Sequence, residues 1–433
     1  MRRIFDLPLP ALQNHLKQRG LPSYHATNIW RAALRHGVTS WADITTLPLS
    51  AREALARSFT LRHGVVASSS ASADGSRKLL VELPRPPRED DDGSGGGGSL
   101  AALLATLPAK AAPPPSPALP PRRVEAVLMP WRGGARSTLC VSIQAGCSLA
   151  CSFCHTGAQK LGGNLSGADV VEQVLLAGAP PTHIVFMGMG EPLLNLRAVK
   201  QAVAVLCGAE GLALPPRRVT ISTAGVAPVI RTLATELPGV RLALSLHAPT
   251  DALRTRLMNV NKAWPLAEVM DALAAFVKTR LRQVAAAGAG SGGEEGGESE
   301  EEEGDGEGGG GALPLRVPGQ RFSGARRVRV SFEYLLLRGV NDGAEHAAQL
   351  VDLLHRWLPH GAARLHAHVN IIPFNPWPGA PGGYAAPSPA AVSAFSAALR
   401  AGGFATTVRR TRGSDVLGAC GQLRSEAEGK PKG

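Results

Sequence analysis

Residues 138–154 read TLCVSIQAGCSLACSFC, a strand-like run that passes directly into three closely spaced cysteines. The apolar and β-branched residues of 138–143 predict a buried strand. The turn after it carries Cys147, Cys151 and Cys154 in a C-x3-C-x2-C arrangement. Three thiolates on one loop can bind three irons of a cubane iron–sulfur cluster, which leaves the fourth iron open to another ligand. The spacing therefore predicts an open cluster at the end of a strand.

A structural zinc ion is the alternative interpretation of these cysteines. Zinc usually takes four ligands, often from paired C-x2-C units. His155 could supply a fourth ligand, but it adjoins Cys154 and is poorly placed to reach the same ion. The spacing favours the cluster, and a zinc-bound protein without catalytic activity stays open as the alternative.

A strand followed by a helix is the pattern of the rest of the chain. Strand-like runs occur at 138–143, 183–187, 218–222, 240–245, 328–334 and 368–372, with helical patterns in most gaps, as at 168–177, 196–206 and 344–357. This alternation predicts a parallel α/β sheet with right-handed crossovers. Six units are too few for a closed eight-stranded barrel, so we expect a partial (β/α)6 barrel. Its ligands should bind at the carboxyl ends of the strands.

Composition divides the chain into three parts. Residues 1–75 begin with amphipathic helical patterns and predict a small N-terminal helical accessory domain. Residues 84–121 are rich in Pro, Gly and Ala and predict a flexible linker. Residues 122–425 form the predicted α/β core. A Gly- and Glu-rich segment at 285–313 interrupts this core and predicts a disordered acidic insertion.

The charge distribution favours a polyanionic partner. The formal net charge is +12, although residues 294–307 alone hold nine acidic side chains and no basic one. Removing those nine charges from +12 leaves +21 for the remainder. Such an excess favours binding to nucleic acid, although a merely basic protein is about equally compatible with charge alone.

Two absences in the sequence bear on the compartment. No run of about 18 apolar residues occurs, so we expect no membrane span, and the N-terminus lacks the apolar segment of a secretory signal. Four of the six cysteines fall within residues 140–154, unlike the even spread of a secreted disulfide scaffold. We therefore expect a reducing compartment: the cytoplasm, or an organelle such as the plastid if the source is eukaryotic. We also expect a monomer.

With Phe153 before its last cysteine, the C-x3-C-x2-C motif resembles the signature of the radical S-adenosylmethionine (SAM) superfamily. In that superfamily a [4Fe-4S] cluster binds SAM at its open iron and cleaves it to a 5′-deoxyadenosyl radical. The turn Gly188–Glu191 is similar to the segment that binds the SAM amino group. The resemblance implies a radical SAM barrel fold for the core.

Four longer motifs resemble the RlmN/Cfr family of radical SAM RNA adenine methyltransferases, and the RlmN type most. They are MGMGEPLLN at 187–195, SLHAP at 245–249, N-x2-P-x-N-P at 370–376, and TRG followed by ACGQL within 411–423. The resemblance covers nearly the whole chain apart from the linker, the acidic insertion and the last ten residues. One departure is His155, because the family prefers a small polar residue directly after the cluster motif.

The resemblance implies three catalytic residues. Cys420 accepts a methyl group from one SAM, and the radical from a second SAM removes a hydrogen from that S-methyl group. The resulting methylene radical adds to a ring carbon of adenine. Cys140 then releases the methylated base by forming a disulfide with Cys420, and Glu125 matches the family's proton acceptor.

The resemblance also implies a set of SAM-binding residues and the partners. The SAM-binding set is Gly190, Glu191, Ser222, Ser245, Leu246, His247 and Asn375, with Leu246 acting through its backbone. The expected substrate is 23S-type ribosomal RNA and possibly tRNA, methylated at C2 of adenine or, as the alternative, at C8. A flavodoxin or ferredoxin is the expected electron donor. Arg409, Arg410 and Arg412, just before Cys420, could hold RNA phosphates. A zinc-bound RNA-binding protein is the alternative from a different functional class.

Overall fold

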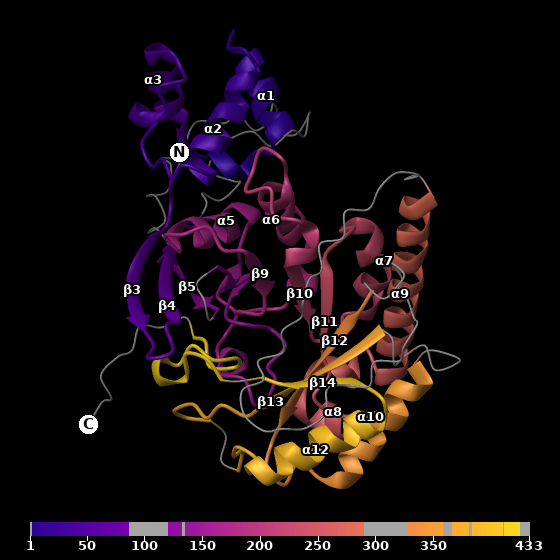
Figure 1. Cartoon of the computed structure of the whole chain (residues 1–433). Helices are drawn as coiled ribbons and strands as arrows, with labels where there is room; N and C mark the ends of the chain where they lie inside the picture. Colours follow the sequence, from indigo (N-terminus) through magenta and orange to yellow (C-terminus); the bar gives the residue numbers. More distant parts are fainter. Residues whose placement is uncertain are drawn as a thin grey trace, which may run out of the picture.

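A ten-stranded mixed sheet organises the chain, as the computed structural model shows (Figure 1). The structure describes residues 2–85, 120–131, 135–289, 328–357, 366–380, 383–409 and 411–424. Most of the predicted linker, and the predicted insertion from residue 290 onward, lie outside these residues. The strand order is β14-β13-β12-β11-β10-β9-β6-β5-β4-β3.

Seven neighbouring strands of this sheet are parallel. They are β6 (Ser137–Cys140), β9 (His183–Phe186), β10 (Val219–Thr223), β11 (Arg241–Ser245), β12 (Val330–Leu336), β13 (Ala367–Pro373) and β14 (Ala405–Val408). The first six are the strands that the sequence predicts, which confirms the α/β fold of radical SAM type. The seventh, β14, was missed because its four residues are mostly exposed and include two threonines, so they carry no apolar signal.

Helices cross from each strand of the parallel part to the next and lie around the outside of the sheet (Figure 1). They are α5 (Gly167–Leu176), α6 (Leu196–Cys207), α7 (Ala227–Glu236), α8 (Asp251–Leu257), α9 (Leu266–Ala289), α10 (Ala344–Trp357) and α12 (Pro389–Ala401). Because helices cover them, the central strands bury near-continuous apolar runs; Leu242, Ala243 and Leu244 are at most 1% exposed. At their carboxyl ends the parallel strands continue into loops.

The N-terminal unit packs three helices, α1 (Leu9–Lys17), α2 (Tyr24–Leu34) and α3 (Leu49–Ser58), around side chains such as Leu12 and Ile29. A short parallel pair joins β1 (Arg2–Arg3) to β2 (Phe59–Thr60). The helices end at Ser58. Residues 65–71, which the sequence assigned to the helical unit, instead form β3 (Val65–Ala71) of the large sheet.

An antiparallel extension continues the sheet beyond β6. It consists of β3, β4 (Arg77–Leu83) and β5 (Arg122–Pro130), paired in that order onto β6. The sequence did not predict β3 because its VVASSSA run is exposed and does not alternate. The predicted acidic insertion was expected to begin at residue 285. In the structure α9 continues to Ala289, so residues 285–289 are helical rather than part of that insertion. Among the described residues, no helix is long and apolar enough to cross a membrane.

Candidate active site

The cysteine loop, residues 147–156, follows the short strand β7 (Gln144–Ala145) at the carboxyl end of β6. Gly146 begins this loop with φ +83, and a Cβ there would lie 2.3 Å from the Lys160 carbonyl oxygen. Only glycine therefore fits the turn that delivers Cys147 into the site. The loop then closes on itself, with the Cys154 N–H donating to the Cys151 carbonyl at 3.1 Å.

The three thiols of the cysteine loop are close enough to perturb one another. Burial raises the pKa of Cys151 well above its ordinary value, and the neighbouring Cys154 and Cys147 raise it further. Burial also raises the pKa of Cys147 to about 11, with added contributions from Cys154 and Glu191. Thiols in this setting stay protonated unless a positive charge compensates them, which is what metal ligation provides.

The donor set fits an iron–sulfur cluster better than a zinc ion. No three His, Cys, Asp or Glu side chains in the described part of the chain converge closely enough to hold a single metal ion. Thiolates that ligate a cubane surround one cluster, but each binds a different iron, so they stand farther apart than the ligands of a single ion. His155 is occupied elsewhere: its Nδ1 donates to the Gln422 carbonyl at 3.1 Å, and its ring stacks on Trp377. His155 is therefore not placed as a fourth zinc ligand.

The Gly188–Glu191 turn, at the carboxyl end of β9, packs against the strand that leads into the cysteine loop. A Cβ on Gly190, which has φ +97, would lie 2.5 Å from the Gln144 side chain. The Glu191 carboxylate accepts from the Leu193 N–H at 3.0 Å and the Ala224 N–H at 2.8 Å. Glu191 thus connects this turn to the end of β10. Burial raises the pKa of Glu191.

The ends of β10 and β11 bring two of the predicted SAM-binding residues together. The hydroxyls of Ser222 and Ser245 lie 3.4 Å apart. Leu246 directly follows, fully buried, with its N–H donating to the Glu333 carbonyl at 3.0 Å and its carbonyl accepting from Arg254 at 3.2 Å. The backbone through which Leu246 was expected to act therefore already has protein partners.

His247 joins the same strand end to the cysteine loop. Its backbone is left-handed, with φ +58, and its Nδ1 accepts from the Leu335 N–H at 3.0 Å. The ring meets Phe153 edge to face with centroids 5.0 Å apart. Burial, and next the nearby Arg254, lower the pKa of His247 to about 3. His247 is consequently a neutral imidazole that carries its proton on Nε2.

Arg254 is a structural residue of the site that the sequence did not point to. It is fully buried on α8 and donates to the carbonyls of Ala224 and Ser245 at 2.5 and 3.2 Å. It also donates to the Asn261 side chain at 2.9 Å. These bonds fix the loops that follow β10 and β11 relative to each other. Its signal in the sequence, one arginine in a short helix, is too common to identify it.

The Cys420 loop, residues 417–424, brings the expected methyl carrier next to both the cysteine loop and Cys140. The Asn375 side chain bonds to this loop: its Nδ2 donates to the Cys420 carbonyl at 3.5 Å, and its Oδ1 accepts from Thr411 at 2.8 Å. Burial raises the pKa of Cys420, and Cys154 contributes to the same shift. Burial raises the pKa of Cys140 to about 12, with Cys420 as its next contributor. Cys420 is thus adjacent to both.

Arg409, at the end of β14, reaches across the carboxyl ends of the strands toward the same cysteines. Its Nη1 lies 4.0 Å from the Met187 sulfur, beyond the end of β9. Its charge lowers the pKa of both Cys140 and Cys420 against the effect of burial. Arg412, which was expected to hold RNA phosphate, donates to the Pro130 carbonyl and lies 5.8 Å from the centre of the Trp131 ring. Arg410 lies outside the described residues.

Glu125 occupies the β5 strand next to Cys140. The register pairs Val127 of β5 with Cys140 of β6 and with Lys78 of β4, so these side chains share one face. The buried Glu125 carboxylate accepts from the Lys78 ammonium at 3.0 Å and from the Arg424 N–H at 2.9 Å. Burial raises its pKa, and Lys78 opposes this shift. Lys78 was not predicted from the sequence.

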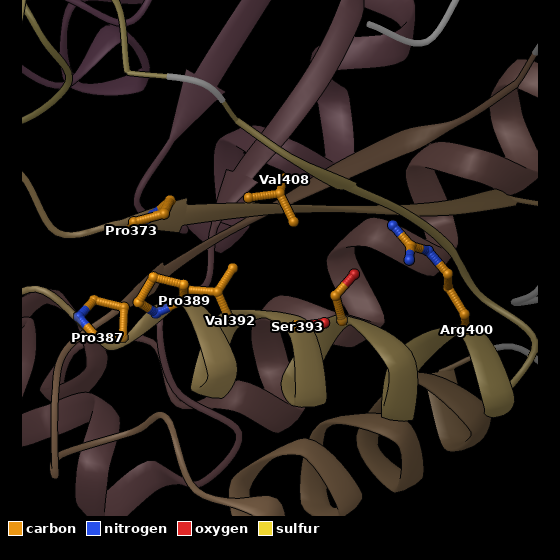
Figure 2. A pocket seen from close by; sticks show the side chains of 8 residues that line it. Pro373, Pro387, Pro389, Val392, Ser393, Arg400 and Val408 are labelled. Atoms are coloured by element: carbon orange, nitrogen blue, oxygen red, sulfur yellow. The ribbon is translucent and has the colours of Figure 1, made fainter. Parts of the chain in front are cut away.

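A surface cavity of about 460 Å³ between α12 and the β13–β14 edge contains none of these residues. Pro373 and Val408 lie on one side of it and Val392 and Ser393 on the other, with Arg400 at one end (Figure 2). The chemistry of the cysteines is therefore located in the loops at the strand ends rather than in this cavity.

Comparison with known proteins gives the family of the chain. A sequence model of the radical SAM superfamily matches residues 141–295. The dual-specificity RNA methyltransferase RlmN of Parvibaculum lavamentivorans is 36% identical over 97% of this chain and 88% of that protein. RlmN of Caulobacter vibrioides is 34% identical over 96% of this chain and 83% of its own length.

A solved structure agrees with this result. The crystal structure of a radical SAM methyltransferase from Sphaerobacter thermophilus superposes with a TM-score of 0.73 at 32% identity. The superposition covers 98% of this chain and 100% of that one. The expected fold is confirmed, and the enzyme interpretation is favoured over the zinc-bound alternative. The chain therefore belongs to the RlmN family of radical SAM RNA methyltransferases.

Proposed function

We propose that this enzyme methylates C2 of an adenine in 23S-type ribosomal RNA and in tRNA, with Cys420 as the methyl carrier. The observation that carries the proposal is that Cys420 packs against the same apolar cluster as Cys154 of the cysteine loop and is close enough to Cys140 to raise its pKa. A methyl carrier needs access both to the site where a methyl group arrives and to a thiol that can release the product. The dual-specificity activity of the relatives supports the two RNA substrates.

The residues at the strand ends fit a cluster with SAM bound to it. Cys147, Cys151 and Cys154 would ligate three irons, and the fourth would bind SAM. Ser222 and Ser245, at the ends of β10 and β11, and Gly190, His247 and Asn375, on the loops that follow strands, would contact the bound SAM. When bound, the cluster and SAM supply a 5′-deoxyadenosyl radical. Glu191 supports this site through the backbone of the neighbouring turn, because both its carboxylate oxygens already accept backbone N–H groups.

Cys420, Glu125 and Cys140 would carry out the other steps of the proposed reaction. Cys420 takes a methyl group by direct displacement, since a thiolate is a competent nucleophile. Glu125 takes the proton that the adenine carbon loses after the methylene group has added; its burial raises its affinity for a proton. The Cys140 thiolate then attacks the Cys420 sulfur; the carbon–sulfur bond to the base breaks with its electron pair on the methylene carbon, which takes up a proton and becomes the methyl group. The disulfide between Cys140 and Cys420 must be reduced before the next turnover. A flavodoxin or ferredoxin would supply the electrons.

The adenine must leave its stack to reach Cys420, since chemistry on a base requires that the base be exposed. Unpaired loops of ribosomal RNA and a tRNA anticodon loop meet this requirement at low cost. The excess of basic residues outside 294–307 would hold the RNA backbone.

Two cysteine variants test the proposal. Cys420→Ala should retain iron and sulfide but form neither product nor adduct, because no methyl carrier remains. Cys140→Ala should stall with RNA covalently attached, visible as a nuclease-sensitive mass shift, whereas the double variant should carry none. Normal turnover by Cys140→Ala, or an adduct that survives the loss of Cys420, would contradict the proposed roles. Nucleoside mass spectrometry of the product separates C2 from C8 methylation.

A further inference from the structure

Three loops that are distant in the sequence converge around His155. The His155 N–H donates to the Gly421 carbonyl at 2.8 Å, and the neighbouring Thr156 hydroxyl donates to the Leu423 carbonyl at 2.6 Å. These bonds tie the cysteine loop to the Cys420 loop. The Gln422 side chain continues the connection by donating to the Pro376 carbonyl at 2.6 Å.

Trp377, on the loop that follows β13, closes the arrangement. Its ring stacks on the His155 ring, with centroids 4.3 Å apart and planes within 6°. Its indole N–H donates to the Phe153 carbonyl at 3.1 Å. Trp377 is 8% exposed and packs in a small apolar cluster that Cys154 and Cys420 both border. The stacked rings therefore contact the cysteine loop and the Cys420 loop at once.

We propose that His155 and Trp377 form a clasp that fixes the Cys420 loop against the cysteine loop, and so positions the methyl carrier. The proposal rests on the function proposed above for Cys420. Both residues are positioning residues, since neither contacts a reacting atom. His155 departs from the small polar residue that the family prefers at this position. Its side chain makes two contacts here, the stack on Trp377 and the Nδ1 bond to the Gln422 carbonyl.

Position matters because a group transfer to Cys420 requires its sulfur to lie within reach of the donor, and small displacements of a reacting group are costly. Hydrogen bonds join the Cys420 loop to the cysteine loop, to the loop after β13 and to Glu125 of β5. Asn375 donates to the Cys420 carbonyl at 3.5 Å, and residues 421–423 bond to His155, to Thr156 and to the Pro376 carbonyl. Loss of the clasp should therefore free the loop without unfolding the sheet.

The experiment measures hydrogen exchange of peptides that cover residues 417–424, in the full-length protein purified anaerobically without RNA. Trp377→Leu removes the stack and the indole bond, and His155→Ser removes the stack from the other side. Each should speed exchange of this segment by about tenfold, because exchange follows the local opening equilibrium. Trp377→Phe keeps a ring but no indole N–H, and should lie between wild type and Trp377→Leu.

Trp357→Leu is the matched control. Trp357 is 6% exposed, and its indole N–H donates to the Met270 carbonyl at 3.0 Å, so it has the same burial and the same kind of bond on α10, away from the Cys420 loop. Its loss should leave exchange of 417–424 at the wild-type rate. The effect of the double variant His155→Ser/Trp377→Leu should be smaller than the two single effects combined, because both single changes remove the same stack. Additive effects, unchanged exchange, or an equal response to Trp357→Leu would overturn the clasp.

A second readout connects the clasp to the reaction. With RNA, SAM and a reductant, Trp377→Leu should produce several-fold more 5′-deoxyadenosine per methylated adenine than wild type, because SAM cleavage would continue while the methyl carrier is displaced. An unchanged ratio alongside faster exchange would overturn the positioning role. If wild type methylates no RNA, the proposed function fails, whereas the exchange measurements still decide whether the clasp exists.

Discussion

Arg409 brings a positive charge to the two cysteines of the proposed reaction. Cys140 is buried at the end of a core strand; burial, and next the nearby Cys420, raise its pKa to about 12 even with Arg409 beside it, which is too high for a thiolate at neutral pH. Arg409 opposes this effect at Cys140 and at Cys420, and in return the two thiols and Glu333 raise the pKa of Arg409 above what burial would give. A guanidinium placed here favours the thiolate form that attacks a methyl group or a sulfur.

Arg409→Met should slow the reaction of both thiols with iodoacetamide. Removing the cation raises both pKa values further, so at pH 8 the thiolate fraction, and with it the alkylation rate, should fall by about fivefold or more. The pH profile of alkylation should move upward, and Arg409→Lys should restore most of the rate. Peptide mass spectrometry of the cluster-loaded protein measures each cysteine separately. Arg412→Met is the control, and an equal effect there would contradict a specific role of Arg409.

At the scale of elements, a buried ionic cluster joins the N-terminal unit to α5. Asp169, in the first turn of α5, accepts from Arg3 at 2.5 Å, from Arg122 at 2.9 Å and from His63 at 3.2 Å. His63 also lies 3.1 Å from Glu172 on the next turn. Burial by itself lowers the pKa of His63, but the two carboxylates raise it by more, so the net shift is upward.

This shift gives stability a defined dependence on pH. A histidine whose folded pKa exceeds the unfolded value of about 6.5 contributes stability that is full below that pH and is lost as pH rises through the folded pKa. The melting temperature of wild type should therefore fall between pH 6 and pH 9 by more than that of His63→Asn. His36→Asn, at an exposed histidine of the same unit, should keep the wild-type profile. Parallel profiles for wild type and His63→Asn would exclude the cluster as the cause.

At the scale of the whole molecule, charge is distributed unevenly along the chain. The net charge of +12 includes the nine carboxylates of residues 294–307, which are offset by no basic residue in that segment. This segment lies outside the described residues, so its effect is predicted from charge alone. RNA binding that depends on neutralising phosphates should respond to the net charge of the protein and to salt.

Replacing those nine acidic residues by their amides keeps the length of the segment and raises the net charge from +12 to +21. Non-specific affinity for a single-stranded RNA should rise, and the gain should be larger at about 50 mM than at about 300 mM salt, because salt screens the added attraction. Filter binding at several salt concentrations measures both effects. The melting temperature should stay unchanged, since the composition of the segment, Gly and acidic residues, predicts that it adds little to the core. Unchanged affinity at low salt would show that the segment does not influence RNA binding.

The sequence by itself determined the cluster motif, six of the seven parallel strands and the family. These features are local: ligand spacing is set within a few residues, and a strand buried on both faces must be apolar along its whole length. The exposed β14 and the exposed, serine-rich β3 carry no such signal, and only the strands beside them in the sheet determine their pairing.

Only the tertiary structure decided how the site residues are used. Glu191 and Leu246 match a SAM-binding pattern. In the structure the Glu191 carboxylate accepts from two backbone N–H groups, and the Leu246 backbone bonds to the Glu333 carbonyl and to the Arg254 side chain. Arg254, Lys78 and the His155–Trp377 clasp have no signal in the sequence, because their partners become neighbours only when the chain is folded. His155 and Gln422 are 267 residues apart in the sequence and 3.1 Å apart in the structure. Contacts of that span depend on how the sheet and its loops pack, which no local pattern records.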